Sequence, residues 1–257
     1  MTIMFEGLQG KSVLVTGAST GIGAAVAKGF GRCGARVGVH YHRNRAAAEQ
    51  VAADVRAAGG EAVVLQGDVT SEADLAQILD GQIAAFGRLD VLINNAGDVV
   101  RRSAFAELTD ELIDDIIALN ARAVVTACRL AIPHFKRQGH GNIINTTSLA
   151  ARQAGGPGSS IYTASKGFAQ SLTRFLAREQ APDNIRVNAV APGLIMTPLQ
   201  DRNTTPEQLE TMARAIPMGR AGIPEDCVGA YLFLATDALS GFITGATIDV
   251  NGGAYLG

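Results

Sequence analysis

The chain has 257 residues, of which 47% are hydrophobic and 18% charged, and its formal net charge is −2. This length allows one α/β domain with a substantial core, and length alone leaves two small domains open. The near-neutral charge gives no electrostatic footprint for a nucleic acid or an anionic membrane surface, so we expect neither as a partner.

The cysteines and the N-terminus favour a soluble cytoplasmic protein. Cys33, Cys128 and Cys227 lie far apart, without a C-x-x-C pair or a Cys/His cluster, which predicts reduced thiols and no metal. The first residues lack the basic and long apolar segments of a signal peptide. Apolar runs are shorter than the roughly 20 residues that span a bilayer.

Short β-branched runs alternate with longer helical patterns along the whole chain. The expected strands are 12–16, 36–41, 62–66, 91–94, 142–146, 186–190 and 247–250. The expected helices are 21–33, 45–58, 71–86, 110–137, 161–180 and 224–236. This alternation predicts βαβ units in a mostly parallel sheet, covered by helices on both faces within a single domain, 1–257. Ligands of such sheets bind beyond the carboxyl ends of the strands.

The loop after the first expected strand, TGASTGIG at 16–23, fits two interpretations. As a G-x-S-x-G elbow it would present Ser19 as a hydrolase nucleophile, but that fold needs a histidine late in the chain. The histidines are His40, His42, His134 and His140. As a phosphate loop it uses Gly17 for a tight turn, Gly21 for close approach and Gly23 for helix packing on the sheet. From the loop alone, a tight strand-to-helix turn that binds no ligand is an equally good interpretation.

A tyrosine and a lysine four residues apart, Tyr162 and Lys166, lie above one another on an expected helix. The ammonium would lower the phenol's pKa from its ordinary value of about 10. Taken alone, such a spacing is common and is more often a surface pair. Ser148 follows the fifth expected strand at the same sheet edge. Asn120 is a poor mid-helix residue, for which a solvent-facing position is the ordinary explanation.

Together these residues resemble the classical short-chain dehydrogenase/reductase family over essentially the whole chain. The matching segments are TGASTGIG at 16–23, Asp68, NNAG at 94–97, Asn120, Ser148, Tyr162-x-x-x-Lys166, PGLIMTP at 192–198 and TGATIDVNGG at 244–253. Each is weak singly, but their joint order and spacing are specific. The resemblance implies a doubly wound, Rossmann-type, seven-stranded parallel sheet. It also implies a homotetramer in which the long helices and the C-terminal segment bury apolar surface.

The resemblance implies an oxidoreductase that moves a hydride directly between a nicotinamide and a substrate carbon, without a metal. Tyr162 would exchange a proton with the carbonyl or alcohol oxygen, and Ser148 would hold that oxygen. Lys166 would bind the nicotinamide ribose and lower the Tyr162 pKa. Asn120 would anchor a water that relays protons to solvent. A non-catalytic nucleotide sensor or scaffold is the alternative, although such a protein has no use for a poised phenol.

The implied cofactor site collects residues that follow several strands. The pyrophosphate and adenosine ribose would meet Gly17, Ser19, Thr20, Gly21, Ile22 and Gly23. The adenine would lie beside Asp68 and Val69, the adjacent ribose region beside Asn95, Ala96 and Gly97, and the carboxamide beside Pro192, Gly193, Ile195 and Thr197. Tyr162 and Lys166 complete the set.

The end of the second expected strand predicts NADP(H) rather than NAD(H). NAD-binding folds often place Asp or Glu there to grip the ribose 2′-hydroxyl, but no carboxylate lies near Tyr41. A 2′-phosphate would instead meet His42, Arg43 and Asn44, with Arg43 able to pair with it. Thr20 weighs against NADP(H), because many NADP-using relatives carry Arg at this position. The alternative that Arg43 points into solvent also stays open.

Substrate choice is expected to lie in a mobile lid at about 194–215, which contains a short helix, Leu199 and Met212. Further pocket walls are expected to be Val99, Arg101, Ala150, Arg152 and Gln153. An inward-pointing Arg101 or Arg152 would favour an acidic or carrier-linked substrate. The sequence does not separate 3-oxoacyl thioesters, ketones and sugars as substrates.

Overall fold

The computed structural model describes residues 5, 7–198 and 205–256. Seven strands form a sheet in the order β3-β2-β1-β4-β5-β6-β7, and all neighbouring strands are parallel. The strands are β1 (Ser12–Val15), β2 (Arg36–Tyr41), β3 (Glu61–Gln66), β4 (Val91–Asn94), β5 (Gly141–Thr146), β6 (Ile185–Pro192) and β7 (Thr247–Val250). The predicted doubly wound parallel sheet and its strands are confirmed.

The helices that connect the strands also match the predictions, apart from one interruption. They are α1 (Gly21–Arg32), α2 (Arg45–Ala57), α3 (Glu72–Phe86), α4 (Asp110–Ile117), α5 (Ala123–Gln138), α7 (Ser160–Gln180) and α10 (Pro224–Ala235). A π-helix, η2 (Ala118–Arg122), separates α4 from α5, so the continuous helix expected at 110–137 is wrong at that point. Shorter pieces are η1 (Phe105–Glu107), α6 (Ala150–Gln153), η3 (Ala181–Asp183), α9 (Pro206–Arg214) and α11 (Asp237–Ser240).

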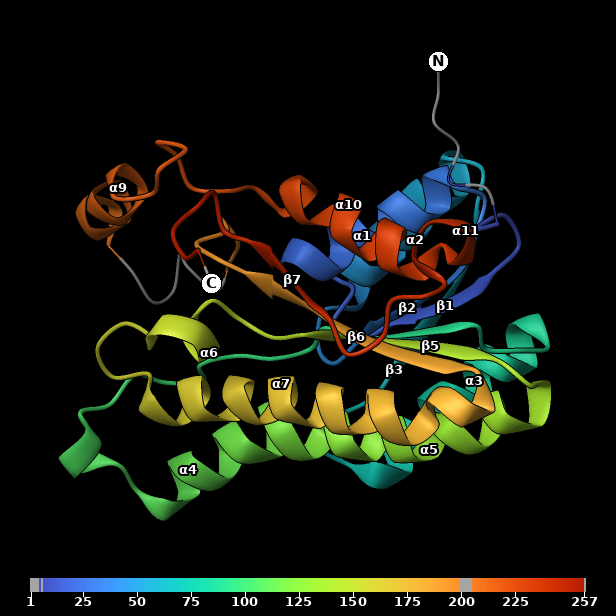
Figure 1. Cartoon of the computed structure of the whole chain (residues 1–257), viewed down its shortest axis with the longest axis horizontal. Helices are drawn as coiled ribbons and strands as arrows, with labels where there is room; N and C mark the ends of the chain where they lie inside the picture. The colour runs from blue at the N-terminus through green and yellow to red at the C-terminus, as the bar shows by residue number, and fades with distance from the viewer. Residues whose placement is uncertain (1–4, 6, 199–204, 257) are drawn as a thin grey trace.

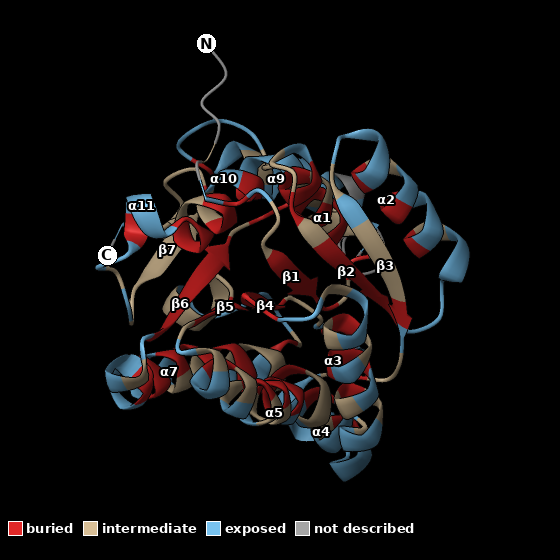
Figure 2. Ribbon diagram, turned by 90° about the vertical axis from the view of Figure 1, so that its right-hand side faces the viewer, coloured by how far each residue is buried: buried red, intermediate tan, exposed pale blue. Residues whose placement is uncertain are grey.

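Helices cover both faces of the sheet, α1, α2 and α10 on one and α3, α5 and α7 on the other (Figure 1). Successive strand side chains point to opposite faces. Val13 and Val15 therefore pack into the cluster that contains Phe30 of α1, while Leu14 packs into the cluster that contains Phe135 of α5. Buried residues fill the inner strands between the layers (Figure 2), whereas the outermost strands β3 and β7 are only partly buried.

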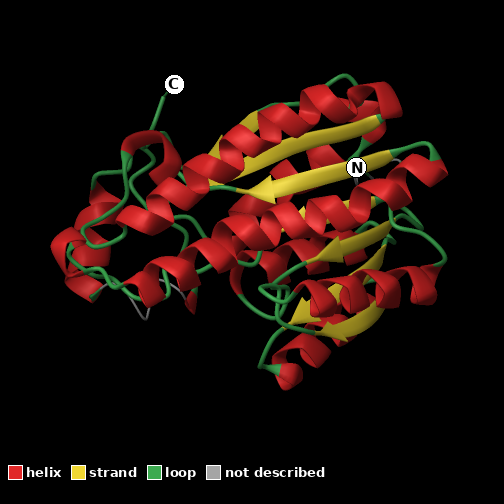
Figure 3. Cartoon of the chain, turned by 90° about the horizontal axis from the view of Figure 1, so that it is seen from below, coloured by secondary structure: helices red, strands yellow, loops and turns green. Residues whose placement is uncertain are grey.

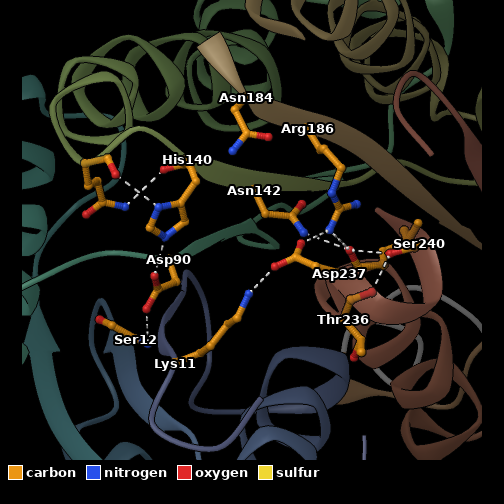
Figure 4. Close-up of polar contacts among 12 residues, drawn as sticks. Lys11, Ser12, Asp90, His140, Asn142, Asn184, Arg186, Thr236, Asp237 and Ser240 are labelled. Atoms are coloured by element: carbon orange, nitrogen blue, oxygen red, sulfur yellow. Dashed lines mark hydrogen bonds and ion pairs between the residues drawn. The ribbon is translucent and has the colours of Figure 1, made fainter. Parts of the chain in front are cut away.

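The amino ends of β1, β4 and β5 are tied together by one buried carboxylate, that of Asp90 (Figure 4). Asp90, which precedes β4, accepts hydrogen bonds from the Ser12 backbone at 2.8 Å and from Arg88, and His140 Nε2 lies 2.9 Å away. Burial raises the pKa of Asp90, but these hydrogen bonds outweigh it and hold the pKa below its usual value. The network fixes the sheet edge opposite the one where ligands of this fold bind.

All strands point toward the end of the molecule where loops and short helices gather (Figure 3). The chain leaves β1 toward β2 on one side, and it leaves β4 toward β5 on the other. This divergence makes the crevice between the loops after β1 and β4 the expected ligand site of an open parallel sheet.

The run Asp110–Gln138 is long and apolar enough to cross a membrane by length and composition alone. In its most apolar window 44% of the residues are buried inside the protein. The buried residues of α5, Phe135 among them, pack on the sheet and on α3. A core helix meets the same criterion, so this run is weak support for a membrane span.

Candidate active site

The glycine loop after β1 adopts the conformation that its sequence predicts. Gly17 and Gly21 have φ values of +65° and +56°, in the left-handed region that favours glycine. A Cβ at Gly23 would lie 2.3 Å from the Gly17 carbonyl oxygen and 2.4 Å from Nδ2 of Asn95. Gly23 therefore lets α1 begin directly beneath the turn, in contact with the loop after β4.

Two polar side chains join the glycine loop to the NNAG segment. The Thr16 hydroxyl oxygen accepts hydrogen bonds from the backbone N–H groups of Asn95 and Ala96, at 2.9 and 3.0 Å. The Asn95 amide donates in return to the carbonyl oxygens of Thr16 and Gly17, at 2.9 and 3.2 Å. The first and fourth loops thus form one rigid surface across the crevice.

The beginning of α1 suits an anionic group. Thr20 is the N-cap residue, yet its side chain makes no capping hydrogen bond, and the first turn holds no acidic residue. Backbone N–H groups at a helix start, together with the helix dipole, favour phosphate. The turn at Gly17, the close packing at Gly23 and this helix start fit the pyrophosphate of a dinucleotide.

The alternative in which Ser19 is a nucleophile gains no base from His40, the histidine beside the glycine loop. Both ring nitrogens of His40 lie at hydrogen-bonding distance from backbone groups, Nδ1 from the Gly17 N–H at 2.9 Å and Nε2 from the Gly67 carbonyl at 3.1 Å. His40 is therefore already engaged and has no nitrogen left to activate Ser19.

Lys166 and Asn120 meet beneath Gly97. A Cβ at Gly97 would lie 2.7 Å from Asn120 Oδ1 and 3.0 Å from Lys166 Nζ. Lys166 is 4% exposed and donates a hydrogen bond to the Thr146 carbonyl at 3.0 Å. The surface-pair alternative for Lys166 is therefore wrong, because its amine is enclosed between the loops after β4 and β5.

Asn120 is fully buried within the π-helix, so the solvent-facing alternative for it is also wrong. Its amide donates to the carbonyls of Asp98 and Ile116, at 2.8 and 2.9 Å, and its oxygen accepts from the Asp98 N–H at 3.1 Å. By binding the Ile116 carbonyl, the side chain competes with the helix's own hydrogen bonds, and π-helical turns of this kind are frequent at functional sites.

Tyr162 lies beside Ser148, and its electrostatics differ from the expectation. Burial raises the Tyr162 pKa above its ordinary value, a hydrogen bond with the Ser148 side chain lowers it, and the Asp98 carboxylate raises it further. The Lys166 amine lies 5.6 Å from the centre of the Tyr162 ring and is directed at Thr146. The expected lowering of the Tyr162 pKa by Lys166 is therefore wrong for this geometry. Burial also lowers the pKa of Lys166 to about 8.

The residues expected around the adenosine follow β2 and β3. Arg43 is exposed, and His42 Nε2 lies 3.8 Å from an Asp68 carboxylate oxygen. Asn44 is the N-cap of α2, where its side-chain oxygen accepts the Ala47 N–H at 3.1 Å, and its NH2 group stays available to donate to a ligand. Val69 is buried, at the start of the turn that precedes α3.

The loop after β6 closes the site from the other side. Pro192 ends β6, and its carbonyl accepts the Leu149 N–H at 2.8 Å, while the Gly193 N–H donates to Val250. Ile195 forms a parallel bridge with Gly222. A Cβ at Gly21 would lie 3.3 Å from the Thr197 side chain, so this loop reaches the glycine loop. Leu199 lies outside the described residues.

The expected pocket walls divide into engaged and open side chains. Arg152 pairs with Asp249 of β7 at 3.4 Å and lies over the Tyr255 ring, 5.8 Å from its centre. Val99 is buried, whereas Arg101 and Gln153 are exposed and Ala150 is partly buried. Arg152 therefore does not supply the inward-pointing cation that would favour an acidic substrate.

Sequence reasoning assigned no role to Thr16, His40 or Asp98, all three of which contact the site. Thr16 is the first residue of the TGASTGIG segment and Asp98 directly follows NNAG, so their positions were a usable signal. His40 lies inside a strand, and nothing in the sequence distinguishes it from an ordinary buried polar residue.

Comparisons with known proteins agree with this arrangement. A family model described as enoyl-(acyl carrier protein) reductase matches residues 17–255. The 3-oxoacyl-[acyl-carrier-protein] reductase FabG of Staphylococcus aureus is 37% identical over 246 residues, 96% of this chain and 98% of the relative. The 3beta-hydroxysteroid dehydrogenase 1 of Eggerthella lenta is 38% identical, covering 98% and 97% of the two chains.

Among solved structures, the NADH-dependent reductase A1-R' complexed with NAD superposes with a TM-score of 0.88 at 37% identity. The match covers 99% of this chain and all of the other. The chain is thus an enzyme of the short-chain dehydrogenase/reductase family of oxidoreductases.

Proposed function

We propose that this enzyme reversibly reduces a carbonyl to a secondary alcohol with a nicotinamide cofactor, and that it favours NADP(H). The observation that carries the proposal is the convergence of four side chains at the sheet edge that carries the glycine loop. Asn120 and Lys166 meet beneath Gly97, and Tyr162 contacts Ser148 at the same sheet edge.

The four side chains have separable roles in the proposed reaction. The nicotinamide supplies or accepts the hydride. Tyr162 gives a proton to the substrate oxygen during reduction, and its raised pKa keeps the phenol protonated at neutral pH, the form this step needs. Ser148 holds the substrate oxygen. Lys166 binds the nicotinamide ribose, and Asn120 positions a water between Lys166 and solvent.

NADP(H) preference is proposed from the charges that follow β2. Tyr41 ends the strand with its hydroxyl bound to Gln66, and no carboxylate follows it before α2. His42 and the exposed Arg43 can meet a 2′-phosphate. The nearby Asp68 carboxylate and Thr20 weigh against this preference, as does the NADH-dependent relative. We expect kcat/KM to be higher for NADPH than for NADH, and the reverse order would refute the preference.

We propose a neutral carbonyl substrate, such as a ketone or sugar, because Arg152 is held by Asp249 and Tyr255. A 3-oxoacyl thioester, the substrate class in the name of the Staphylococcus aureus relative, is the competing class. The chain would act as one cytoplasmic domain, with the segment 194–215 as its lid. Met212 of α9, within this segment, and Met218, just after it, are exposed and offer an apolar surface for the lid to close on.

We further propose a homotetramer. Phe168 and Phe175 lie on the outer surface of α7, the latter 63% exposed, and Phe242 and Leu239 are exposed near the edge strand β7. Apolar side chains of this size are favourable to bury between subunits. Light scattering is expected to give the mass of four chains, and a monomer would refute the proposal.

The decisive experiment combines a carbonyl panel with one substitution. We expect NADPH oxidation with at least one ketone, sugar or 3-oxoacyl thioester, and we expect Tyr162→Phe to abolish it while cofactor affinity is retained. Tyr231→Phe is the control, since it removes a buried hydroxyl bonded to Thr146 outside the substrate site. If the wild type binds NADPH and reduces none of these carbonyls, the protein is a sensor or scaffold and the proposal fails.

A further inference from the structure

His40 connects the carboxyl ends of three neighbouring strands. It lies near the end of β2, is 2% exposed, and accepts the Gly17 N–H on Nδ1 at 2.9 Å. Its Nε2 lies 3.1 Å from the Gly67 carbonyl, directly before Asp68, and its own carbonyl accepts the Ala18 N–H at 2.8 Å. A single residue thus contacts the glycine loop after β1 and the loop after β3.

The hydrogen bonds determine which nitrogen of His40 carries the proton. Nδ1 faces the N–H of Gly17 and must accept, so in the neutral ring the proton sits on Nε2 and is donated to Gly67. The pKa of His40 is lowered to about 4, mainly by burial and also by nearby His42, against the opposing effects of the Gly67 carbonyl and Asp68. The ring is therefore neutral at pH 7, and both of its nitrogens are used.

The two loops held by His40 are those expected on either side of the adenosine. Gly17 makes the turn beneath the pyrophosphate position, and Asp68 and Val69 border the adenine position. Backbone groups that must face a ligand bind best when they are already in place, because ordering them on binding lowers the affinity. Gly17 has no Cβ and adopts a positive φ, so its orientation depends on what its N–H contacts.

We propose that His40 is a positioning residue for the adenosine half of the dinucleotide, holding the glycine loop and the Gly67–Val69 loop at the spacing that this half requires. The inference rests on the proposed cofactor function. It assigns His40 no contact with the ligand and no part in hydride or proton transfer.

The test measures binding of NADPH, and of ADP as a probe of the adenosine half alone, by calorimetry on the full chain. His40→Leu removes both ring hydrogen bonds, and we expect it to weaken both ligands by about tenfold, the scale of one unsatisfied buried N–H. His40→Asn places an oxygen at the same distance along the side chain as Nδ1. We expect it to recover most of the affinity by accepting the Gly17 N–H.

Val37→Ala is the matched control, because Val37 is equally buried in β2 but lies at the other end of the strand. It should lose stability without a change in either dissociation constant. Unchanged binding in His40→Leu, or His40→Asn binding no better than His40→Leu, would overturn the inference. If His40→Leu does not fold, His40→Asn is compared with His40→Ala, which also removes both ring hydrogen bonds, and Ala binding as well as Asn would overturn it. Failure of the wild type to bind either NADPH or NADH would refute the proposed function instead.

Discussion

The close approach of α1 to the glycine loop predicts a large effect for Gly23→Ala. The added methyl group would lie 2.3 Å from the Gly17 carbonyl oxygen and 2.4 Å from the Asn95 amide nitrogen. Neither atom is free to move, since the Asn95 amide also donates to Thr16 and Gly17. The substitution must therefore displace the glycine loop, the NNAG segment or the start of the helix.

The expected loss of stability is the balance of three contributions. Replacing glycine by alanine inside a helix stabilises by about 1 kcal/mol. Overpacking a buried site costs about 1–3 kcal/mol. Breaking the hydrogen bonds of Asn95 costs about 1–3 kcal/mol more. The net destabilisation is therefore about 3 kcal/mol, and because the displaced groups lie at the proposed pyrophosphate site, NADPH affinity should fall as well.

Urea unfolding of Gly23→Ala against Gly229→Ala tests this reasoning. Gly229 also lies inside a helix, α10, but a Cβ there has no neighbour within 4 Å. Gly229→Ala should therefore keep the helix gain of up to about 1 kcal/mol without any clash. Equal stabilities of the two variants, or unchanged NADPH binding in Gly23→Ala, would refute the close-packing account.

Three further predictions concern charge and strain. The pKa of Asp90 in the folded protein is below its unfolded value, so the stability that its ionised form contributes is complete above about pH 4 and is lost as the pH falls through the folded pKa. Asp90→Asn should therefore flatten the fall of the unfolding free energy in acid. An unchanged slope would contradict this. The Lys166 pKa of about 8 is below its unfolded value, so as the pH rises the folded state loses the ammonium proton at a lower pH than the unfolded state does. Wild-type stability should therefore rise relative to Lys166→Met between pH 8 and about 10, and parallel pH curves would contradict this. Val100 is 43% exposed at a φ of +63°, so Val100→Gly should raise the free energy of unfolding by up to about 1 kcal/mol of relieved strain, and Tm with it. A lower Tm would show that the conformation is not strained.

The strands and the glycine loop could be predicted from sequence because local chemistry determines them. The inner strands are buried on both faces, so they are apolar along their length and stand out from the helices between them. Gly17 and Gly21 need positive φ values that few other residues adopt. Once strand order is known, the residues after the strands must gather at one edge.

The interruption of the long helix could not be predicted, because its cause lies elsewhere in the chain. Asn120 is held by the backbone of Asp98, a segment that arrives from β4. Helical periodicity contains no information about that contact. The contacts of His40 could not be predicted for the same reason, because its partners Gly17 and Gly67 follow different strands.

The Tyr162–Lys166 pair shows why spacing predicts proximity better than electrostatics. Four residues on a helix do bring the two side chains together, yet the amine is directed at the Thr146 carbonyl, which competes for its proton. Burial then disfavours both charges, raising the tyrosine's pKa and lowering the lysine's. If Tyr162 is the proposed acid, burial keeps its phenol protonated at neutral pH but also makes it a weaker proton donor than a free tyrosine. Positive charge beside the phenol in the loaded enzyme would then be needed to bring its pKa toward the working range, in either direction of the reaction.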